Sequence, residues 1–421
     1  MERRTFIKNT GIVSAGSLVV PHIVFGRSAA SAVQLGIIGC GNRGTAVITS
    51  MMKHNNCRIV AMADLFEDKL KMRAPTYNQL NKEKGFDDVK TGNMYRGPKS
   101  FEQLLRNKEV DAVLISSPAY THPDFLEAAI ASGKHVYCEK PAAVDVDGCR
   151  RMQRAGGSVN AKQSVVIGFQ IRYASPYVEM IKRIHNGAIG DIINAQLYYL
   201  SSANEVKGKE GMSKDEFMIR DHFHYRSMSG GILLDQGIHM LDVCNWGLQK
   251  LPVKAIGGGG LKLSEHQGDA WNHYQVIYEY PDGMQVTCQS TQFGDVFGDV
   301  CARFLGTKGI AEAHYSGGVF IKGENKWDSG IIRDGDSVTP EQRASGAFLS
   351  SLEDADPNKG KSFINSIETA KFLNQCEQGA TSTMTAILGR QAAEKKKGVS
   401  WQEMIEGNEK IPSGVDVMKF A

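Results

Sequence analysis

Apolar and polar positions follow two different rhythms along this chain. In the first third, short apolar runs of the kind found in buried strands are separated by longer amphipathic stretches. The runs occupy residues 34–39, 58–63, 112–116 and 135–138, with helical stretches at 45–53, 67–73 and 125–132. This alternation predicts an α/β domain with a parallel sheet and right-handed crossovers. A ligand of such a sheet binds at the carboxyl ends of the strands.

After about residue 155 longer strand-like runs follow one another, with turns between them. They occupy residues 192–200, 253–256, 271–280 and 284–291, and residues 257–260 are expected to be a flexible turn. Residues 156–421 are therefore predicted to form an α+β domain with a large, open, mostly antiparallel sheet. Tyrosines alternate along these runs, which predicts an exposed apolar face and hence a homo-oligomer, a dimer or tetramer. These tyrosines are Tyr198, Tyr274, Tyr278 and Tyr280.

The first 32 residues are a targeting segment. Arg3 and Arg4 precede an apolar stretch at residues 11–20, and a small-residue site follows at residues 30–32. This pattern resembles a twin-arginine export signal and predicts a periplasmic protein whose mature chain begins near Val33. The alternative is an uncleaved basic arm.

Composition narrows the class of partner. The 421 residues are 42% hydrophobic and 23% charged, and the net charge of +3 is too small to indicate nucleic acid or an anionic membrane. No later stretch is long enough to span a membrane. The eight cysteines are scattered without C-x-x-C or zinc spacing, so free thiols are expected.

A glycine-rich turn follows the first strand. Gly39, Gly41 and Gly44 form G-x-G-x-x-G, in which the glycines permit a tight turn, close approach of a pyrophosphate and close helix packing. Asp64 lies twenty residues beyond Gly44, at the end of the second strand, where a carboxylate accepts hydrogen bonds from a ribose diol. This predicts a Rossmann domain, doubly wound, that binds NAD. The turn residues Asn42 and Arg43 would also line the cofactor, and Arg43 leaves NADP open because it could reach a phosphate.

Two further strand ends fall on the same edge of the sheet. Ser117 and Pro118 follow the third strand, with His122 four residues later, and Glu139 and Lys140 precede Pro141 after the fourth. A proline after each strand keeps its predecessor extended and ends the ladder. Lys140 at this position can stabilise a developing alkoxide; the alternative is a solvated surface lysine.

Asp235 and His239 are four residues apart, so a helix would place both on one face. A carboxylate beside an imidazole fixes its tautomer and raises its basicity, which suits proton removal from a carbinol. Alternatively, Asp235 favours a helix N-terminus and His239 is a core histidine. His222 and His224 lack helical ligand spacing and a partner carboxylate motif, so no metal site is expected, and a substrate-lining loop is favoured. Arg172 and Tyr173 either reach a sugar hydroxyl or pack at the domain junction.

The glycine turn, the Ser-Pro-x-x-x-His strand end and Glu-Lys-Pro together resemble the Gfo/Idh/MocA oxidoreductase family. The resemblance covers most of residues 33–405. It implies that Lys140, Asp235 and His239 are catalytic, because they match the family's lysine and its Asp-x-x-x-His. One departure is Ala119, where the family often has asparagine after the proline.

The resemblance implies oxidation of a sugar, polyol or glycoside hydroxyl by hydride transfer to NAD. Export implies a cofactor that stays bound and is regenerated in each cycle, because free NAD is scarce outside the cytoplasm. One alternative is an NAD-dependent glycoside hydrolase that oxidises its substrate transiently. The other is a sugar- or NAD-binding protein without enzymatic activity.

Overall fold

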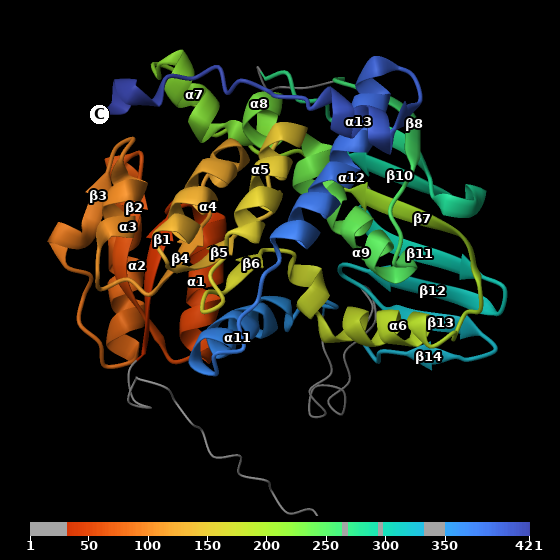
Figure 1. Ribbon diagram of the computed structural model, residues 1–421, viewed down its shortest axis with the longest axis horizontal. Helices are drawn as coiled ribbons and strands as arrows, with labels where there is room; N and C mark the ends of the chain where they lie inside the picture. Colours follow the sequence, from red (N-terminus) through yellow and green to blue (C-terminus); the bar gives the residue numbers. More distant parts are fainter. Residues whose placement is uncertain (1–31, 263–267, 294–297, 332–349) are drawn as a thin grey trace, which may run out of the picture. The chain divides into compact units, whose positions relative to one another are not determined.

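The first third of the described chain forms a parallel sheet of six strands in the order β3-β2-β1-β4-β5-β6, as the alternation predicts (Figure 1). The computed structural model describes residues 32–262, 268–293, 298–331 and 350–421. The segment with Arg3 and Arg4, which is expected to be an export signal, lies outside these residues. The strands are β1 Val33–Ile38, β2 Cys57–Asp64, β3 Met94–Arg96, β4 Ala112–Ile115, β5 His135–Cys138 and β6 Val165–Ile167. The helices between them are α1 Asn42–His54, α2 Glu67–Glu83, α3 Ser100–Arg106, α4 His122–Ala131 and α5 Val146–Gly157.

Both faces of this sheet are covered, which is why its strands read as nearly continuous apolar runs. On one face Leu35 and Ile37 of β1 belong to a buried cluster with residues of α1 and α2. On the other face Val113 and Ile115 of β4 belong to a second cluster with residues of α3, α4 and α5. All strands run the same way, so their carboxyl ends share one edge.

The second sheet has nine strands in the order β14-β13-β12-β11-β7-β10-β9-β8-β15. Only β7 and β10 pair in parallel, which confirms the mostly antiparallel sheet. Its strands are β7 Ile192–Leu200, β8 Lys254–Gly260, β9 His273–Glu279, β10 Gln285–Thr291, β11 Asp299–Gly306, β12 Gly309–His314, β13 Val319–Gly323, β14 Trp327–Asp328 and β15 Val399–Ser400.

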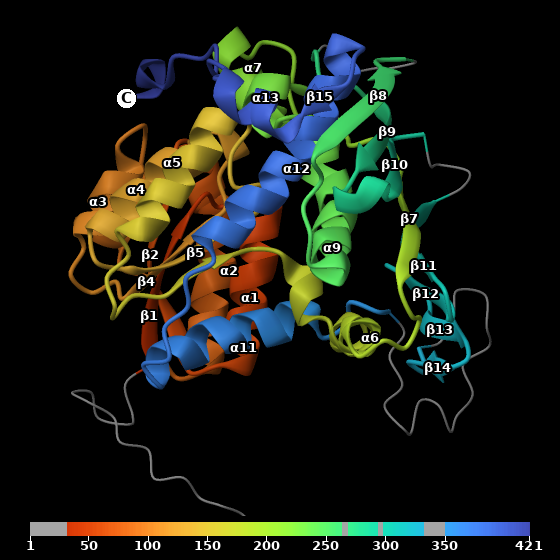
Figure 2. The same cartoon turned by 45° about the vertical axis from the view of Figure 1, so that its right-hand side comes forward.

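Helices of the second half cover one face of this sheet and reach the first one. They are α6 Ser175–His185, α7 Lys214–Arg220, α8 Arg226–Ser229, α9 Ile238–Leu248, α11 Ala355–Glu368, α12 Cys376–Lys395 and α13 Trp401–Gly407. The long helix α12 contacts α5 on one side and β8 and β9 on the other, so it joins the two sheets (Figure 2). Helix α11 contacts α1, next to the glycine turn.

Two expected local structures differ from those observed. Residues 257–260 are not a turn but the second half of β8, paired with β9. A side chain at Gly257 or Gly259 would come within 2.7 or 2.2 Å of a β9 carbonyl oxygen, which explains why glycine is used inside this strand. The apolar run at residues 165–171 also predicts a strand, but the strand ends at Ile167, and a short 3₁₀ helix, Gln170–Tyr173, follows it.

Three of the four tyrosines that suggested an exposed apolar face do not lie on one, whereas Tyr198 is half-buried. Tyr274, Tyr278 and Tyr280 are 4%, 0% and 0% exposed, because they point to the helix-covered side of the sheet. These three tyrosines do share one face, as the alternation predicts, but that face is the inner face of the sheet. Among the described residues, no helix is both long enough and apolar enough to cross a membrane.

Candidate active site

The glycine turn between β1 and α1 is held tightly against β4. Gly39 has φ +91, and a side chain there would lie 2.7 Å from the backbone of Ser116 and Ser117. A side chain on Gly44 would lie 2.8 Å from the Gly39 carbonyl oxygen. Around Gly41, in contrast, no atom lies within 4 Å of where a side chain would begin. The turn is therefore closed on the protein side and open at Gly41, as a backbone that receives a phosphate group must be.

Asp64 is fixed beside this turn by two backbone hydrogen bonds. Its Oδ2 accepts from Cys40 N at 2.8 Å, and its Oδ1 accepts from Phe66 N at 2.9 Å. Helix α1 begins at Asn42 and has no acidic residue in its first turn, so its free N–H groups and positive dipole end face the opening. This donor set, with a carboxylate one strand away, fits a dinucleotide.

Arg43 of the glycine turn is engaged by three side chains and also borders the cavity described below. Its guanidinium donates to Asp356 Oδ2 at 2.7 Å, to Glu139 Oε1 at 3.1 Å and to Gln170 Oε1 at 2.7 Å. Lys359, which is fully buried, lies 2.7 Å from Asp356 and 3.7 Å from Glu139. Burial alone would raise the pKa of Glu139, but Arg43 and Lys359 outweigh it and lower that pKa. The result is a four-charge network between the glycine turn, the end of β5 and α11, in which Glu139 and Lys359 are buried and Arg43 and Asp356 are partly exposed.

The loops after β4 and β5 are tied together by His122. Its two ring nitrogens lie 2.7 Å from the Pro141 carbonyl oxygen and 2.9 Å from that of Ser117. The Ser117 hydroxyl is 2.6 Å from that of Thr121, and Pro118 begins the short 3₁₀ turn between them. The buried imidazole thus joins the two loops while one edge of it borders the cavity described next.

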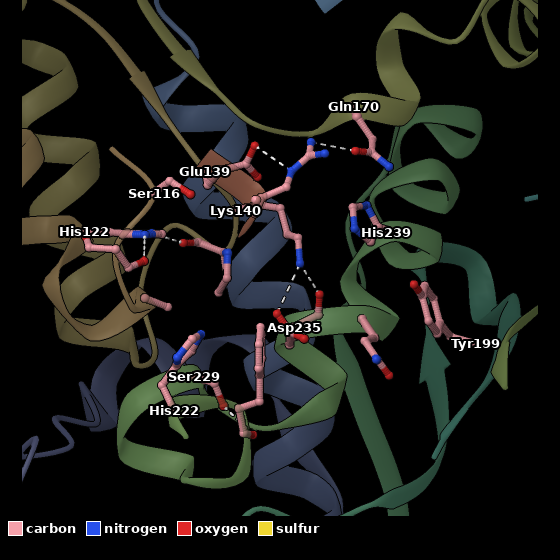
Figure 3. Close-up of a pocket in the computed structure, with 16 residues that line it drawn as sticks. Ser116, His122, Glu139, Lys140, Gln170, Tyr199, His222, Ser229, Asp235 and His239 are labelled. Atoms are coloured by element: carbon pink, nitrogen blue, oxygen red, sulfur yellow. Dashed lines mark hydrogen bonds and ion pairs between the residues drawn. The ribbon is translucent and has the colours of Figure 1, made fainter. Parts of the chain in front are cut away.

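A cavity of about 320 Å³ lies over the carboxyl ends of β4 and β5 (Figure 3). Lys140, Asp235 and His239 all border it, although they come from β5 and from the two ends of a helical segment 95 residues away. The Lys140 ammonium donates to the main-chain carbonyl of Asp235 and lies 3.3 Å from its Oδ1. Both side chains are largely buried, 15% and 18% exposed, so this pair is shielded from bulk water.

The expected contact between Asp235 and His239 is not among the hydrogen bonds of the described residues, and Asp235 pairs with Lys140 instead. Residues Leu233–Gly237 form a π-helical turn before α9 begins at Ile238. This wider turn changes the angular offset between positions four apart, so Asp235 and His239 do not stack as they would in an α-helix. Sequence spacing alone does not show such a turn.

His239 is 6% exposed, and its Nδ1 has no hydrogen-bond partner among the described residues. Burial, together with the positive charges of Lys140, Arg43 and Lys359, holds the pKa of His239 well below its usual value. Tyr199 stacks on the ring with centroids 6.3 Å apart, and Tyr315 meets it edge-on at 5.9 Å. His239 is thus a neutral imidazole at neutral pH, held by two aromatic rings and able to accept a proton.

Only some of the other candidate substrate residues border the cavity. His222 borders the cavity, whereas His224 is buried outside it with its Nδ1 2.9 Å from Asp221. Arg172 forms a two-pronged ion pair with the buried Asp242. The Tyr173 hydroxyl accepts from Gln375 at 2.8 Å. Neither Arg172 nor Tyr173 borders the cavity, and both have partners from other segments.

Some cavity residues carried no usable signal in the sequence. Gln170, Tyr199 and Gln236 border the cavity, and Tyr315 supports His239 from β12's end. Tyr199 lies in strand β7. The alternation of side chains along a strand shows which residues share a face with Tyr199, but not that this face borders a cavity. Asp356 and Lys359 lie more than 200 residues from Glu139, so nothing local indicated that they would meet it.

Comparisons with known proteins agree with this geometry. Residues 33–167 match the model of an oxidoreductase family with an NAD-binding Rossmann fold, GFO/IDH/MocA, and residues 177–312 match the C-terminal domain model of the same family. Inositol 2-dehydrogenase of Rhizobium meliloti is 24% identical over 87% of this chain and 99% of its own length. Myo-inositol 2-dehydrogenase of Thermotoga maritima is 22% identical over 89% of this chain and all of its own length.

Solved structures share the fold. The aldose–aldose oxidoreductase of Caulobacter crescentus, crystallised with glycerol, aligns with a TM-score of 0.67 at 19% identity, over 88% of this chain and 99% of its own. The scyllo-inositol dehydrogenase of Lactobacillus casei, with bound NAD(H) and scyllo-inositol, aligns with a TM-score of 0.63 at 22% identity over the same shares.

Proposed function

The chain belongs to the Gfo/Idh/MocA family of NAD-binding oxidoreductases, and on this premise we propose that it oxidises a CH–OH group of a sugar or polyol. It is an NAD-dependent enzyme of the class to which its inositol dehydrogenase relatives belong. One observation carries the proposal for this chain: a neutral imidazole, His239, and a shielded ammonium, Lys140, border the same cavity beside the dinucleotide turn.

The residues that would hold NAD are those of the open glycine turn, the start of α1 and Asp64. When bound, NAD supplies the acceptor for the hydride that leaves the carbinol carbon. The cavity with Lys140 and His239 is where the substrate hydroxyl would be received.

The chain's own residues handle the proton and the charge. His239 accepts the hydroxyl proton on a ring nitrogen, which its lowered pKa leaves vacant at neutral pH. Lys140 stabilises the negative charge that grows on the oxygen, in a site where its charge is little screened. Asp235 holds the Lys140 ammonium in place through its main-chain carbonyl and its side-chain carboxylate. Glu139, anchored by Arg43, fixes the backbone from which Lys140 projects.

Substitution of His239 by alanine tests this assignment. The variant should keep bound NAD but lose hydride transfer by about 10²–10⁴-fold. The measurement is the absorbance of bound NADH after rapid mixing with inositols, aldoses and glycosides. His185→Ala, at a histidine on α6 outside the cavity, serves as the matched control. Hydride transfer at the wild-type rate in His239→Ala would exclude His239 as the base, and His222 would be tested next.

Two net reactions are compatible with this hydride transfer. A cofactor that stays bound and is regenerated in each cycle fits either exchange of hydride between two sugars or transient oxidation during glycoside cleavage. Screening glycosides for released aglycone, and paired sugars for exchange, separates the two. A chain that binds NAD and sugars but forms no NADH, no exchanged sugar and no aglycone would support a non-enzymatic binding protein.

Export to the periplasm is supported by Arg3 and Arg4, followed by the apolar stretch at residues 11–20. Replacement of both arginines by lysine should keep the protein in the cytoplasm, as cell fractionation would show. Unchanged export would exclude the twin-arginine route.

A homo-oligomer is supported by a different observation from the tyrosines. Ile256 and Ile277 are cross-strand partners and are 52% and 37% exposed on the outer face of the nine-stranded sheet. Light scattering at micromolar protein concentration tests this, and a monomeric mass would exclude it.

A further inference from the structure

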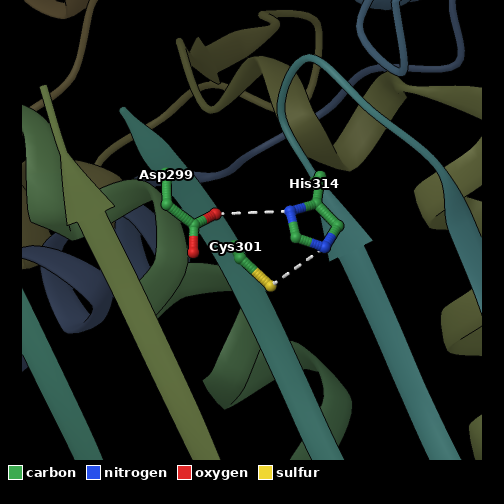
Figure 4. Close-up of side chains that lie close together, drawn as sticks. All are labelled: Asp299, Cys301 and His314. Carbon is green, nitrogen blue, oxygen red and sulfur yellow. Dashed lines mark hydrogen bonds and ion pairs between the residues drawn. The ribbon is translucent and has the colours of Figure 1, made fainter. Parts of the chain in front are cut away.

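A group of metal-ligating side chains lies on the nine-stranded sheet, apart from the active site. Asp299 and Cys301 of β11 and His314 at the end of β12 face one another (Figure 4). One donor atom of each lies within 4.8 Å of the donor atoms of the other two. Cys301 and His314 are direct cross-strand partners, and Asp299, two residues from Cys301, points to the same face.

This group faces away from the catalytic cavity. Phe304, three positions from Cys301 and therefore on the opposite face, packs against Gly247 of α9 on the inner side. Cys301 is buried, while His314 and Asp299 are 30% and 24% exposed at the side chain. His314 and Asp299 are therefore accessible from solvent on the outer face, and the Cys301 thiol lies buried beside them.

The two ring nitrogens of His314 have different surroundings. Nδ1 is 3.3 Å from Asp299 Oδ1. Two ligands bound tetrahedrally at about 2.0–2.1 Å from a zinc ion are separated by about 3.3 Å, so this pair already has the spacing of one ligand edge. Nε2 is 2.6 Å from Glu312 Oε1, and Glu312 is held through its other oxygen by Arg303. A carboxylate that accepts the second N–H of a histidine fixes its tautomer and ring orientation, as it does behind many zinc-bound histidines.

The thiol completes the set. Cys301 Sγ lies 3.8 Å from His314 Nε2, and one donor atom of each of the three residues lies within 4.8 Å of those of the other two. The side chains must therefore shift by about 1 Å to bring the thiol into zinc–sulfur geometry beside Nδ1. Oxygen-only sites suit magnesium and calcium, whereas a thiolate with an imidazole selects zinc-like ions.

We propose that Asp299, Cys301 and His314 bind a divalent transition metal ion of the zinc class, with Glu312 orienting the histidine from behind. Three protein ligands leave a fourth position for water on the outer face. The ion would join β11 to β12 without taking part in hydride transfer. The alternative is that the same side chains hold no ion and form an ion-pair cluster with a protonated His314. The experiment must distinguish this ion-pair cluster from the metal site.

Cobalt(II) is the probe, because a tetrahedral thiolate-bound cobalt ion absorbs visible light where NADH does not. Cobalt is added to the chelator-treated, NAD-loaded protein. The proposal expects one cobalt per chain with intense visible bands, which zinc displaces. Cys301→Ser should lose the bands, and Glu312→Gln should weaken binding about 10–100-fold. Cys288→Ser is the matched control, because this cysteine is equally buried but lies on β10 with its side chain on the other face.

Absence of visible bands in the wild-type protein, or bands of equal intensity in folded Cys301→Ser, would overturn the proposal in favour of the ion-pair cluster. Thermal melts give an independent readout in case Cys301→Ser folds poorly. Zinc should raise the melting temperature of the wild-type and Cys288→Ser proteins and have a reduced effect on Glu312→Gln. An equal shift in Glu312→Gln and in the wild-type protein would contradict the proposed role of Glu312.

Discussion

The ammonium group of Lys140 contacts Asp235 twice, at the main-chain carbonyl and at Oδ1 3.3 Å away. Lys140 lies two residues beyond the end of β5 in the first sheet, and Asp235 lies in the π-helical turn that leads into α9. The contact therefore couples the two halves of the chain at the cavity. It also means that the carboxylate acts on the lysine and not on the histidine four residues along.

A double-mutant cycle tests this coupling. Asp235→Asn should slow hydride transfer, and the loss should largely disappear when Lys140 is already alanine, because residues in one network couple by about 0.5–3 kcal/mol. In a His239→Ala background the same loss should persist in full. The measurement is single-turnover NADH formation for the three single and two double variants. Coupling to His239 and not to Lys140 would restore the carboxylate–imidazole pair as the working unit.

The pH dependence of the reaction follows from the environment of His239. Its lowered pKa keeps the imidazole neutral below its usual pKa of 6.5, so kcat/KM should fall only at more acidic pH. Asp356 opposes the shift, since its negative charge raises the pKa of His239. Asp356→Asn should therefore move the acidic limb to still lower pH. The measurement is a pH–rate profile under single-turnover conditions. An acidic limb at or above pH 6.5 that loss of Asp356 does not move would contradict this account.

Cofactor choice depends on Asp64. Its carboxylate would repel the 2′-phosphate of NADP, and Arg43, the nearby cation in the turn, is engaged by Glu139 and Asp356. NAD should therefore bind more tightly than NADP, and Asp64→Ala should narrow the difference by weakening NAD. Calorimetry with both cofactors measures this. Glu67→Ala, at the next carboxylate along, is the control, because Glu67 is exposed and pairs with Lys71. Equal NAD and NADP affinity in the wild-type protein would contradict the prediction.

Release of NAD should depend on the end of the chain. Phe66, two residues after Asp64, has the Arg220 guanidinium 3.9 Å from its ring centroid and the Phe420 ring packed edge-on at 5.3 Å. Contacts of this kind contribute about 0.5–2 kcal/mol each, so losing one should speed NAD release by roughly 2- to 30-fold.

The variants are Arg220→Ala and Phe420→Ala, and release is followed by the fluorescence of bound NADH after mixing with excess NAD. Met418→Ala is the matched control, because this residue lies on the same terminal segment but is 53% exposed. Wild-type release rates in both test variants would show that these contacts do not retain the cofactor.

The features that the sequence could predict are those set by residues close together in the chain. The glycine spacing is visible because each glycine responds to backbone geometry within a few residues, as the φ of Gly39 and the packing of Gly44 show. The strand ends at Ser117 and Lys140 were predictable because a parallel sheet places all its carboxyl ends on one edge. Alternation showed that Tyr274, Tyr278 and Tyr280 share a face, but a period of two does not tell which face is inside.

The sequence by itself determined the two sheets, the dinucleotide turn and the set of chemistry-bearing residues Lys140, Asp235 and His239. Only the tertiary structure decided how they pair, because a partner is chosen by proximity in space. Arg43 was drawn to Asp356 and Glu139, and Arg172 to Asp242, since buried charges need a partner and the nearest one lies on a distant segment. The same reason separates Asp235 from His239: the wider turn, which packs against α12 and β10, brings the carboxylate to the lysine that follows β5.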